Sequence, residues 1–181
     1  DFYNFKAQRY NFFRKSAYLC RTKLIQMSKQ EVILCRNFGN DLINAIKKCP
    51  HDRLFVITDE NTHKHCLINE KNIFPKEVIF QEIIIGADDV NKTLETLASV
   101  WQALSQQGAS RHSLLINLGG GMVTDLGGFA ASTFKRGISY INIPTTLLSM
   151  VDASVGGKTG INFNGLKNEI GVFSPASSVL I

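Results

Sequence analysis

The stretch Leu114-Leu115-Ile116-Asn117-Leu118-Gly119-Gly120-Gly121-Met122-Val123-Thr124-Asp125 sets the fold expected for this 181-residue chain. An apolar run passes through three glycines into a segment whose apolar positions are spaced for a helix. Glycine allows a positive φ in a tight turn and lets the backbone approach a ligand closely. The start of a helix offers unpaired N–H groups and the positive end of the helix dipole. The stretch therefore predicts a strand, a turn and a helix that hold a pyrophosphate.

Two further polar clusters follow along the chain. The segment 141–143 leads into Pro144-Thr145-Thr146, where proline stops a strand and a threonine hydroxyl either caps the next helix or meets a ligand. The other cluster is Gly156-Gly157-Lys158-Thr159-Gly160, followed by Lys167-Asn168. Open α/β sheets bind ligands at the carboxyl ends of their strands. We therefore expect both clusters to be strand ends beside the glycine turn.

The rest of the chain alternates between predicted strands and helices. Strands are expected at 31–35, 53–58, 77–85, 114–118, 140–143 and 178–181, and helices at 40–48, 91–107, 122–129 and 145–155. The continuous apolar run 54–57 is typical of a strand buried on both faces. The apolar face of the helix at 91–107 is expected to hold Leu94, Leu97, Ala98, Trp101 and Leu104. The pattern predicts an α/β fold: an open, mostly parallel sheet with crossover helices, as in a Rossmann-like nucleotide-binding domain.

Composition and charge exclude two classes of protein. The chain is 44% hydrophobic and 19% charged, and its apolar runs are far shorter than the roughly 20 residues of a membrane span. The net charge of +5 arises in residues 1–26, which hold six basic residues and one acid, and the remainder holds 14 of each sign. Nucleic-acid binding by the whole chain needs a basic excess that the remainder lacks. Residues 1–26 are predicted to be a disordered or non-native extension, with a targeting arm as the alternative, and residues 27–181 to form the α/β domain.

Cysteine and histidine spacing argues against a metal site in this chain. The four cysteines form no Cys-x-x-Cys pair, which favours reduced thiols and a cytoplasmic protein. His63 and His65 are two residues apart on a predicted helix, so they are expected to lie on different faces.

Two common nucleotide-binding templates fail. The dinucleotide fingerprint Gly-x-Gly-x-x-Gly needs a glycine where Thr124 stands. The Walker A motif ending at Gly157-Lys158-Thr159 needs a leading glycine where Asp152 stands, and a carboxylate there would repel phosphates.

A longer pattern of five motifs does match that of a known protein family. In chain order its parts are Gly119-Gly120-Gly121-x-x-x-Asp125, Lys135-Arg136-Gly137, Pro144-Thr145-Thr146-Leu147-Leu148, Val151-Asp152-x-Ser154-Val155-Gly156-Gly157-Lys158-Thr159-Gly160 and Lys167-Asn168-x-Ile170-Gly171. This pattern resembles the 3-dehydroquinate synthase family. The resemblance is dense over residues 113–173, looser from residue 31 onward, and absent from residues 1–26.

The resemblance implies an enzyme of aromatic amino acid biosynthesis. Members of the family bind NAD in the N-terminal domain and a catalytic divalent metal, zinc or cobalt, in a C-terminal helical domain. They convert 3-deoxy-D-arabino-heptulosonate 7-phosphate to 3-dehydroquinate and phosphate, and act as homodimers. The metal ligands, one Glu and two His, are expected beyond Ile181. We therefore expect this chain to keep an NAD site without catalysing the full reaction alone.

The resemblance also implies roles for individual residues. The cofactor-binding set is Asp59, Asp89, Lys92, Gly120, Gly121, Asp125, Thr145, Thr146, Lys158 and Lys167. The catalytic set is Asp152, Lys158, Asn168 and Arg136, with Arg136 reaching the substrate phosphate across a dimer interface. Two departures affect this assignment: Asp88-Asp89 replaces a Gly-Glu pair, and Leu166 stands where the family has glycine. Asp125 could instead be an acid favoured by the helix dipole, and Lys158 and Lys167 could be solvated.

Two other functions remain open. Iron-dependent polyol dehydrogenases share the glycine turn and the Pro-Thr-Thr segment, but are not expected to carry Lys135-Arg136-Gly137 or the motifs at 151–160 and 167–168. The second alternative is an inactive nucleotide-binding fragment.

Overall fold

The structure is a computed structural model that describes residues 30–67 and 73–181, so the predicted extension over 1–26 lies outside the described residues. The strands are β1 (Glu31–Ile33), β2 (Leu54–Asp59), β3 (Gln81–Ile85), β4 (Leu114–Gly119), β5 (Ser139–Pro144), β6 (Lys158–Phe163), β7 (Leu166–Phe173) and β8 (Ser178–Leu180). The α-helices are α2 (Phe38–Lys48), α3 (Glu60–Thr62), α4 (Leu94–Gln106) and α5 (Gly121–Thr133). Short helical turns are η1 (His63–Leu67), η2 (Asp89–Asn91), η3 (Phe134–Arg136) and η4 (Ser149–Ala153). Within the described ranges, no helix combines the length and hydropathy needed to cross a bilayer.

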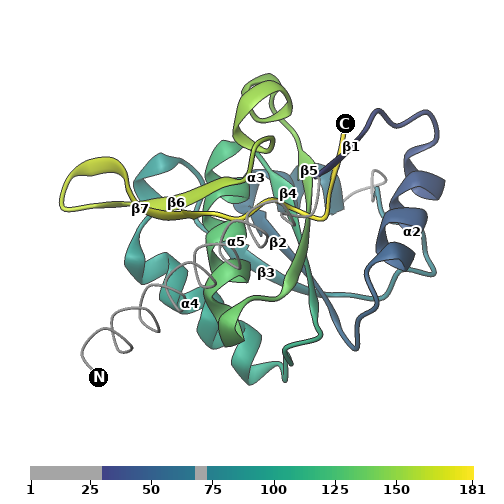
Figure 1. The fold of residues 1–181 in the computed structure, drawn as a ribbon, viewed down its shortest axis with the longest axis horizontal. Coiled ribbons are helices and arrows are strands. Elements are labelled where there is room, and N and C mark those ends of the chain that lie inside the picture. Colours follow the sequence, from purple (N-terminus) through teal and green to yellow (C-terminus); the bar gives the residue numbers. More distant parts are fainter. Residues whose placement is uncertain (1–29, 68–72) are drawn as a thin grey trace, which may run out of the picture.

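A six-stranded sheet forms the centre of the molecule, with the order β1-β8-β5-β4-β2-β3 and every pair parallel. Helices α4 and α5 cover one face and α2 covers the other (Figure 1). Strand β2 contributes to both cores, because Phe55 packs with the α4–α5 side and Val56 with the α2 side. The run 54–57 is thus buried on both faces, as predicted. The predicted fold class is confirmed.

Local sequence explains where the two amphipathic helices begin. The Asn37 side chain accepts a hydrogen bond from the Asn40 N–H at the start of α2, at 3.1 Å. The Thr93 hydroxyl does the same for the Thr96 N–H at the start of α4, at 3.3 Å. The predicted face of α4 is partly wrong: Leu94 is 42% exposed and Ala98 is exposed, whereas Val100 is fully buried. Leu97, Val100 and Leu104 form the buried stripe, because α4 packs against α5 and β3 along that side.

The glycine-rich segment after β5 differs from its prediction. It was expected to contribute a strand end of the main sheet, but Lys158 and Lys167 lie in β6 and β7, which form a separate antiparallel hairpin. This hairpin lies across α5 (Figure 1). The two elements approach closely, because a Cβ at Gly128 would lie 2.5 Å from Thr159 Cγ2. The helix predicted at 145–155 is present but shorter and irregular, since helical backbone covers only Leu147–Leu148 and the π-helical turn η4 that follows.

Candidate functional site

The glycine turn joins the end of β4 to the start of α5. Gly120 is the N-cap residue with extended backbone, and no side chain caps the helix. A Cβ at Gly119 would lie 2.5 Å from Val123 Cγ2, and one at Gly120 would lie 3.2 Å from Thr146 Cγ2. The turn is therefore too tight for side chains. It leaves the first N–H groups of α5 without a side-chain acceptor, which is the arrangement that binds phosphate at helix N-termini.

The end of β5 lies against this turn. The Thr145 N–H donates to the Gly119 carbonyl at 3.0 Å. The Thr146 hydroxyl accepts from the Ser149 N–H at 3.3 Å, so it caps the turn that leads into η4, one of the two roles predicted for a threonine here. Both threonines are exposed at the rim. Gly120, Gly121, Thr145 and Thr146 are thus brought together, as expected for a common ligand.

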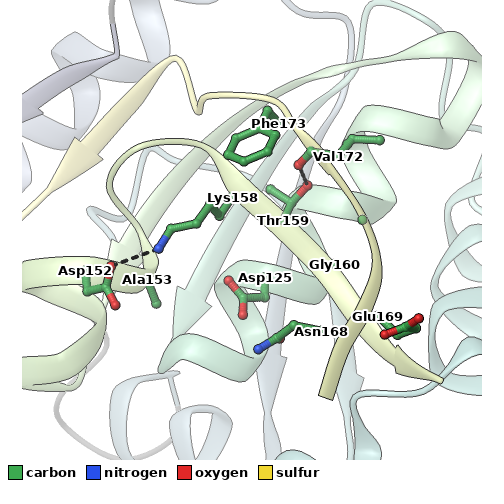
Figure 2. A pocket seen from close by; sticks show the side chains of 11 residues that line it. Asp125, Asp152, Ala153, Lys158, Thr159, Gly160, Asn168, Glu169, Val172 and Phe173 are labelled. Atoms are coloured by element: carbon green, nitrogen blue, oxygen red, sulfur yellow. Dashed lines mark hydrogen bonds and ion pairs between the residues drawn. The ribbon is translucent and has the colours of Figure 1, made fainter. Parts of the chain in front are cut away.

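A cavity of about 410 Å³ opens beside the glycine turn (Figure 2). Helix α5, η4 and the hairpin supply its lining: Asp125, Asp152, Ala153, Lys158, Thr159, Gly160, Asn168, Glu169, Gly171, Val172 and Phe173. Lys158 Nζ lies 3.2 Å from Asp152 Oδ1, and both side chains are about 60% exposed, at 61% and 60%. The glycine turn adjoins one of these lining residues, because a Cβ at Gly121 would lie 3.3 Å from that of Ala153. Three predicted catalytic residues, Asp152, Lys158 and Asn168, therefore line one cavity.

Lys92 contacts two residues that line this cavity, Asp125 and Asn168. Its Nζ lies 2.5 Å from Asp125 Oδ2 and donates to Asn168 Oδ1 at 2.5 Å. Only 4% of the Lys92 side chain and 20% of the Asp125 side chain are exposed. Burial raises the pKa of the Asp125 carboxyl above its ordinary value, and the Lys92 ammonium opposes that shift. Asp125 is the fifth residue of α5, beyond the first turn. Its position therefore argues against the alternative that this acid serves only to interact with the helix dipole.

Asp89 and Lys167 pair with each other near the turn of the hairpin. Asp89 Oδ2 lies 2.9 Å from Lys167 Nζ. That hydrogen bond, helped by one from Asn162, holds the pKa of the Asp89 carboxyl below its ordinary value. Both residues line a second hollow of about 720 Å³ with Asn162. These two predicted cofactor residues are not among those that line the 410 Å³ cavity.

Asp59 lies at the end of β2, in the strand next to β4. Its carboxylate accepts from the Thr62 N–H at 2.7 Å and so caps α3. The predicted ribose contact therefore stands at the same edge of the sheet as the glycine turn, on a carboxylate that already holds one backbone donor.

Arg136 is the predicted residue that the fold keeps apart from the others. It follows the C-terminal end of α5, whose 13 residues place it roughly 20 Å from the glycine turn. Lys135 and Arg136 both have positive φ, 47° and 70°, and Arg136 is exposed. This chain therefore does not bring Arg136 to its own cavity.

Two residues of this region were missed by sequence reasoning. The Tyr140 hydroxyl donates to the Ser174 carbonyl behind the hairpin, and burial raises its pKa, so it stays neutral. Asn162 bonds to Asp89 and Asn168. The only signal for Asn162 was one polar residue between Ile161 and Phe163, which also fits an ordinary alternating strand.

Among residues 30–67 and 73–181, no group of three His, Cys, Asp or Glu side chains is arranged to hold a metal ion. His63, in η1, instead pairs through Nδ1 with Glu82 Oε1 at 2.8 Å.

Comparison with known proteins identifies the family. Residues 82–181 match the model described as 3-dehydroquinate synthase N-terminal. The chain belongs to the 3-dehydroquinate synthase family. A 3-dehydroquinate synthase from Parabacteroides distasonis is 52% identical over 157 residues, which cover 86% of this chain and 44% of that relative. The chain thus spans less than half the length of this 3-dehydroquinate synthase.

Two solved structures extend the comparison. A 2-epi-5-epi-valiolone synthase from Streptomyces hygroscopicus, with NAD+ and Zn2+ bound, is 34% identical, with a TM-score of 0.71, over 84% of this chain and 42% of its own. A glycerol dehydrogenase from Schizosaccharomyces pombe has a TM-score of 0.62 at 18% identity, over 84% of this chain and 36% of its own. The second likeness concerns the fold alone, so it does not carry the polyol dehydrogenase function to this member of the 3-dehydroquinate synthase family.

Proposed function

We propose that the chain is the NAD-binding part of a 3-dehydroquinate synthase, a cytoplasmic phosphate lyase of the shikimate pathway. Its substrate would be 3-deoxy-D-arabino-heptulosonate 7-phosphate, and its products 3-dehydroquinate and phosphate. One observation carries the proposal: the uncapped start of α5 lies directly beside a cavity that is lined by carboxylate groups and by the Lys158 ammonium. A dinucleotide phosphate on the turn would therefore adjoin a polar substrate in the cavity.

The residues at the turn fit NAD. The glycine backbone and the bare helix start suit a pyrophosphate, and the exposed Thr145 and Thr146 hydroxyls stand beside it. Asp59, one strand away, suits the hydroxyls of an adenosine ribose and would repel the extra phosphate of NADP. The named structure with NAD+ bound, at 34% identity, supports this assignment.

The cavity residues fit a phosphorylated sugar acid. Gly120, Gly121, Thr145 and Thr146 would hold NAD, which would supply reversible hydride transfer at C5 of the substrate without net consumption. Lys158 supplies a positive charge for an anionic substrate, and Asp152, 3.2 Å from it, can accept a hydrogen bond from a substrate hydroxyl. Asn168 adds an amide, and the Lys92–Asp125 pair keeps that amide in place. Phosphate elimination needs no dedicated protein base, because the substrate phosphate itself can take the proton.

The divalent metal implied by the family has no matching ligand set among the described residues. The side chains of the cavity would bind and orient the substrate and supply charge.

Arg136 requires a second copy of the chain in this proposal. It is exposed and roughly 20 Å from the glycine turn of its own chain. We place it at the phosphate of the substrate bound by the partner subunit of a homodimer, where an arginine fork suits phosphate oxygens.

Titration of the 181-residue chain with NAD tests the cofactor part of the proposal. We expect saturable binding that is lost in Gly121→Val, because the added side chain would be forced against Ala153. Gly39→Val, in α2 and away from the turn, is the control. Absence of saturable NAD binding by the wild-type chain would overturn the proposal.

The reaction itself separates the two enzyme classes. A synthase releases phosphate from the sugar acid in the presence of NAD and a divalent metal without accumulating NADH. A polyol dehydrogenase instead forms one NADH for each polyol oxidised. The assay applies to this chain and to any longer polypeptide that contains it, and NADH accumulation from glycerol without phosphate release would favour the alternative.

A further inference from the structure

Asn168 stands at an irregularity in the hairpin. Between the pairs Ile161–Ile170 and Phe163–Leu166, β6 contributes only Asn162 whereas β7 contributes Lys167, Asn168 and Glu169. Asn168 has a φ of 55°, a left-handed conformation that side chains other than glycine adopt at a cost in free energy. Bulges of this kind redirect side chains next to active sites. Something in the surrounding structure must hold Asn168 in this conformation.

The side chain of Asn162 does so, and both ends of its amide are used. Its Oδ1 accepts from the Asn168 N–H at 3.0 Å. Its Nδ2 donates to the Asp89 carbonyl at 3.2 Å and to the Asp89 carboxylate at 3.3 Å. The backbone N–H of Asn162 donates to the Lys92 carbonyl at 2.8 Å. One residue therefore ties the bulge in β7 to the turn that carries Asp89 and Lys92.

Asn162 is linked to the cavity indirectly, through the contacts of Asn168. Asn168 Oδ1 accepts from Lys92 Nζ, and the same ammonium pairs with Asp125. Asn168 and Asp125 line the 410 Å³ cavity, but Asn162 does not. Asn162 contacts three predicted site residues from outside the cavity, so it is suited to orienting them and not to contacting a ligand there.

We propose that Asn162 is a positioning residue, which sets Asn168 and Asp89 by bridging the bulge of the hairpin to the turn before α4. The inference rests on the proposed function, because Asn168, Asp89 and Lys92 matter only if the site binds NAD and substrate. Asn162 can play this role in the observed conformation, without movement of any other part of the chain.

The test exchanges donor and acceptor between two side chains. Asn162→Asp keeps an acceptor for the Asn168 N–H but places a carboxylate against that of Asp89. We expect the Kd for NAD to rise about tenfold or more, a typical result of a like-charge contact. Adding Asp89→Asn to that variant restores a donor–acceptor pair, so the amides of residues 167–169 are expected to exchange more slowly in the double variant than in Asn162→Asp alone. Asn164→Asp, in the exposed turn of the same hairpin, is the matched control and should bind like the wild type.

Hydrogen exchange gives a second readout. The amides of residues 167–169 should exchange faster in Asn162→Ala than in the wild type, whereas those of α5 should be unchanged. If Asn162→Asp and Asn162→Ala bind NAD like the control, or if the amides of residues 167–169 exchange as fast in the double variant as in Asn162→Asp, the positioning role is overturned and the proposed function stands. If the wild-type chain itself shows no NAD binding, the proposed function fails and the inference falls with it.

Discussion

Lys92 and Asp125 form an ion pair that is largely withdrawn from water, with 4% and 20% of their side chains exposed. Such a pair gains little over two apolar residues, because removing both charges from water costs about as much as their attraction returns. Breaking it is different, because the remaining charge stays buried without a partner. The pair also serves the cavity, since the same ammonium holds the Asn168 amide.

Lys92→Met is therefore expected to destabilise the fold by about 3 kcal/mol near neutral pH. A carboxyl whose pKa is raised by folding stabilises the protein fully only below its unfolded pKa of about 4, and that contribution is lost as the pH rises through the folded pKa. Burial already raises the pKa of Asp125, and removing Lys92 raises it further. The loss should therefore be larger at pH 8 than at pH 5, as measured by urea unfolding.

A matched control is Lys48→Met. Lys48 pairs with Glu31 at 2.8 Å, but both side chains are exposed, at 57% and 47%. Exposed pairs contribute at most about 1 kcal/mol, so this variant should show a small loss that does not change between the two pH values. Equal losses at both pH values for Lys92→Met would contradict the role given to Asp125.

At the scale of elements, α5 is the helix on which the site depends, because it carries the glycine turn and Asp125 and lies between the sheet and the hairpin. Its glycines allow this. A Cβ at Gly127 would lie 2.1 Å from Asn117 Oδ1 in β4, and one at Gly128 would meet Thr159 in β6. The helix therefore approaches the sheet on one side and the hairpin on the other more closely than side chains would permit.

Gly127→Ala should destabilise the protein by about 2 kcal/mol, because overpacking forces a backbone shift that the intrinsic helix preference of alanine does not offset. For a domain of this size that corresponds to a fall in Tm of roughly 4–8 °C. Gly39→Ala is the control: in α2 its Cβ would lie 3.4 Å from Pro75, an ordinary contact, so its Tm should be unchanged or slightly higher. Thermal unfolding of both variants checks the prediction, and a Gly127→Ala protein as stable as wild type would refute it.

The same elements show what could be read from the sequence. The strand 54–57 and the turn 119–121 were predictable, because their signals are local: a continuous apolar run, and glycines between a strand and a helix. The hairpin was not, because glycines and hydroxyls at 156–160 fit a strand end as well as a hairpin. What decides between them is distant packing, in which Gly128 admits Thr159 and Gly160 pairs with Gly171. The prediction of the buried face of α4 was partly wrong for a related reason. Helical spacing is compatible with several overlapping faces, and only the packing against α5 and β3 selects one of them.

The buried polar contacts of the site were equally hidden. Asn117 and Asn142 stand in otherwise apolar strands, and the Asn117 amide donates to Asn142 Oδ1 at 2.8 Å across the sheet. Asn142 in turn donates to the Ser154 carbonyl at 3.3 Å, just beyond η4. Spacing alone does not show that two asparagines 25 residues apart are partners. The motif residues could be named from sequence, but the residues that hold them could not.

At the scale of the whole molecule, ligand binding and stability are linked. A ligand that binds only the folded chain raises its stability by RT ln(1 + [L]/Kd), which is about 2.7 kcal/mol at a concentration one hundred times Kd. For a chain of 181 residues this predicts a rise in Tm of roughly 5–11 °C with saturating NAD. The turn, the two threonines and Asp59 lie at the ends of β2, β4 and β5, so bound NAD would contact adjacent strands of one sheet.

Asp59 then allows the choice of nucleotide to be tested on the whole chain. Its carboxylate would repel the additional phosphate of NADP, so NADP should raise the Tm much less than NAD at equal concentration. Asp59→Asn removes the charge but keeps an N-cap residue for α3, since asparagine caps helices as well as aspartate does. The variant should therefore fold normally. The difference between the rises in Tm caused by NAD and by NADP should become smaller, mainly because the variant binds NAD more weakly. An unchanged difference would mean that the ribose lies elsewhere along the sheet edge, because a charge that contacts neither nucleotide cannot discriminate between them.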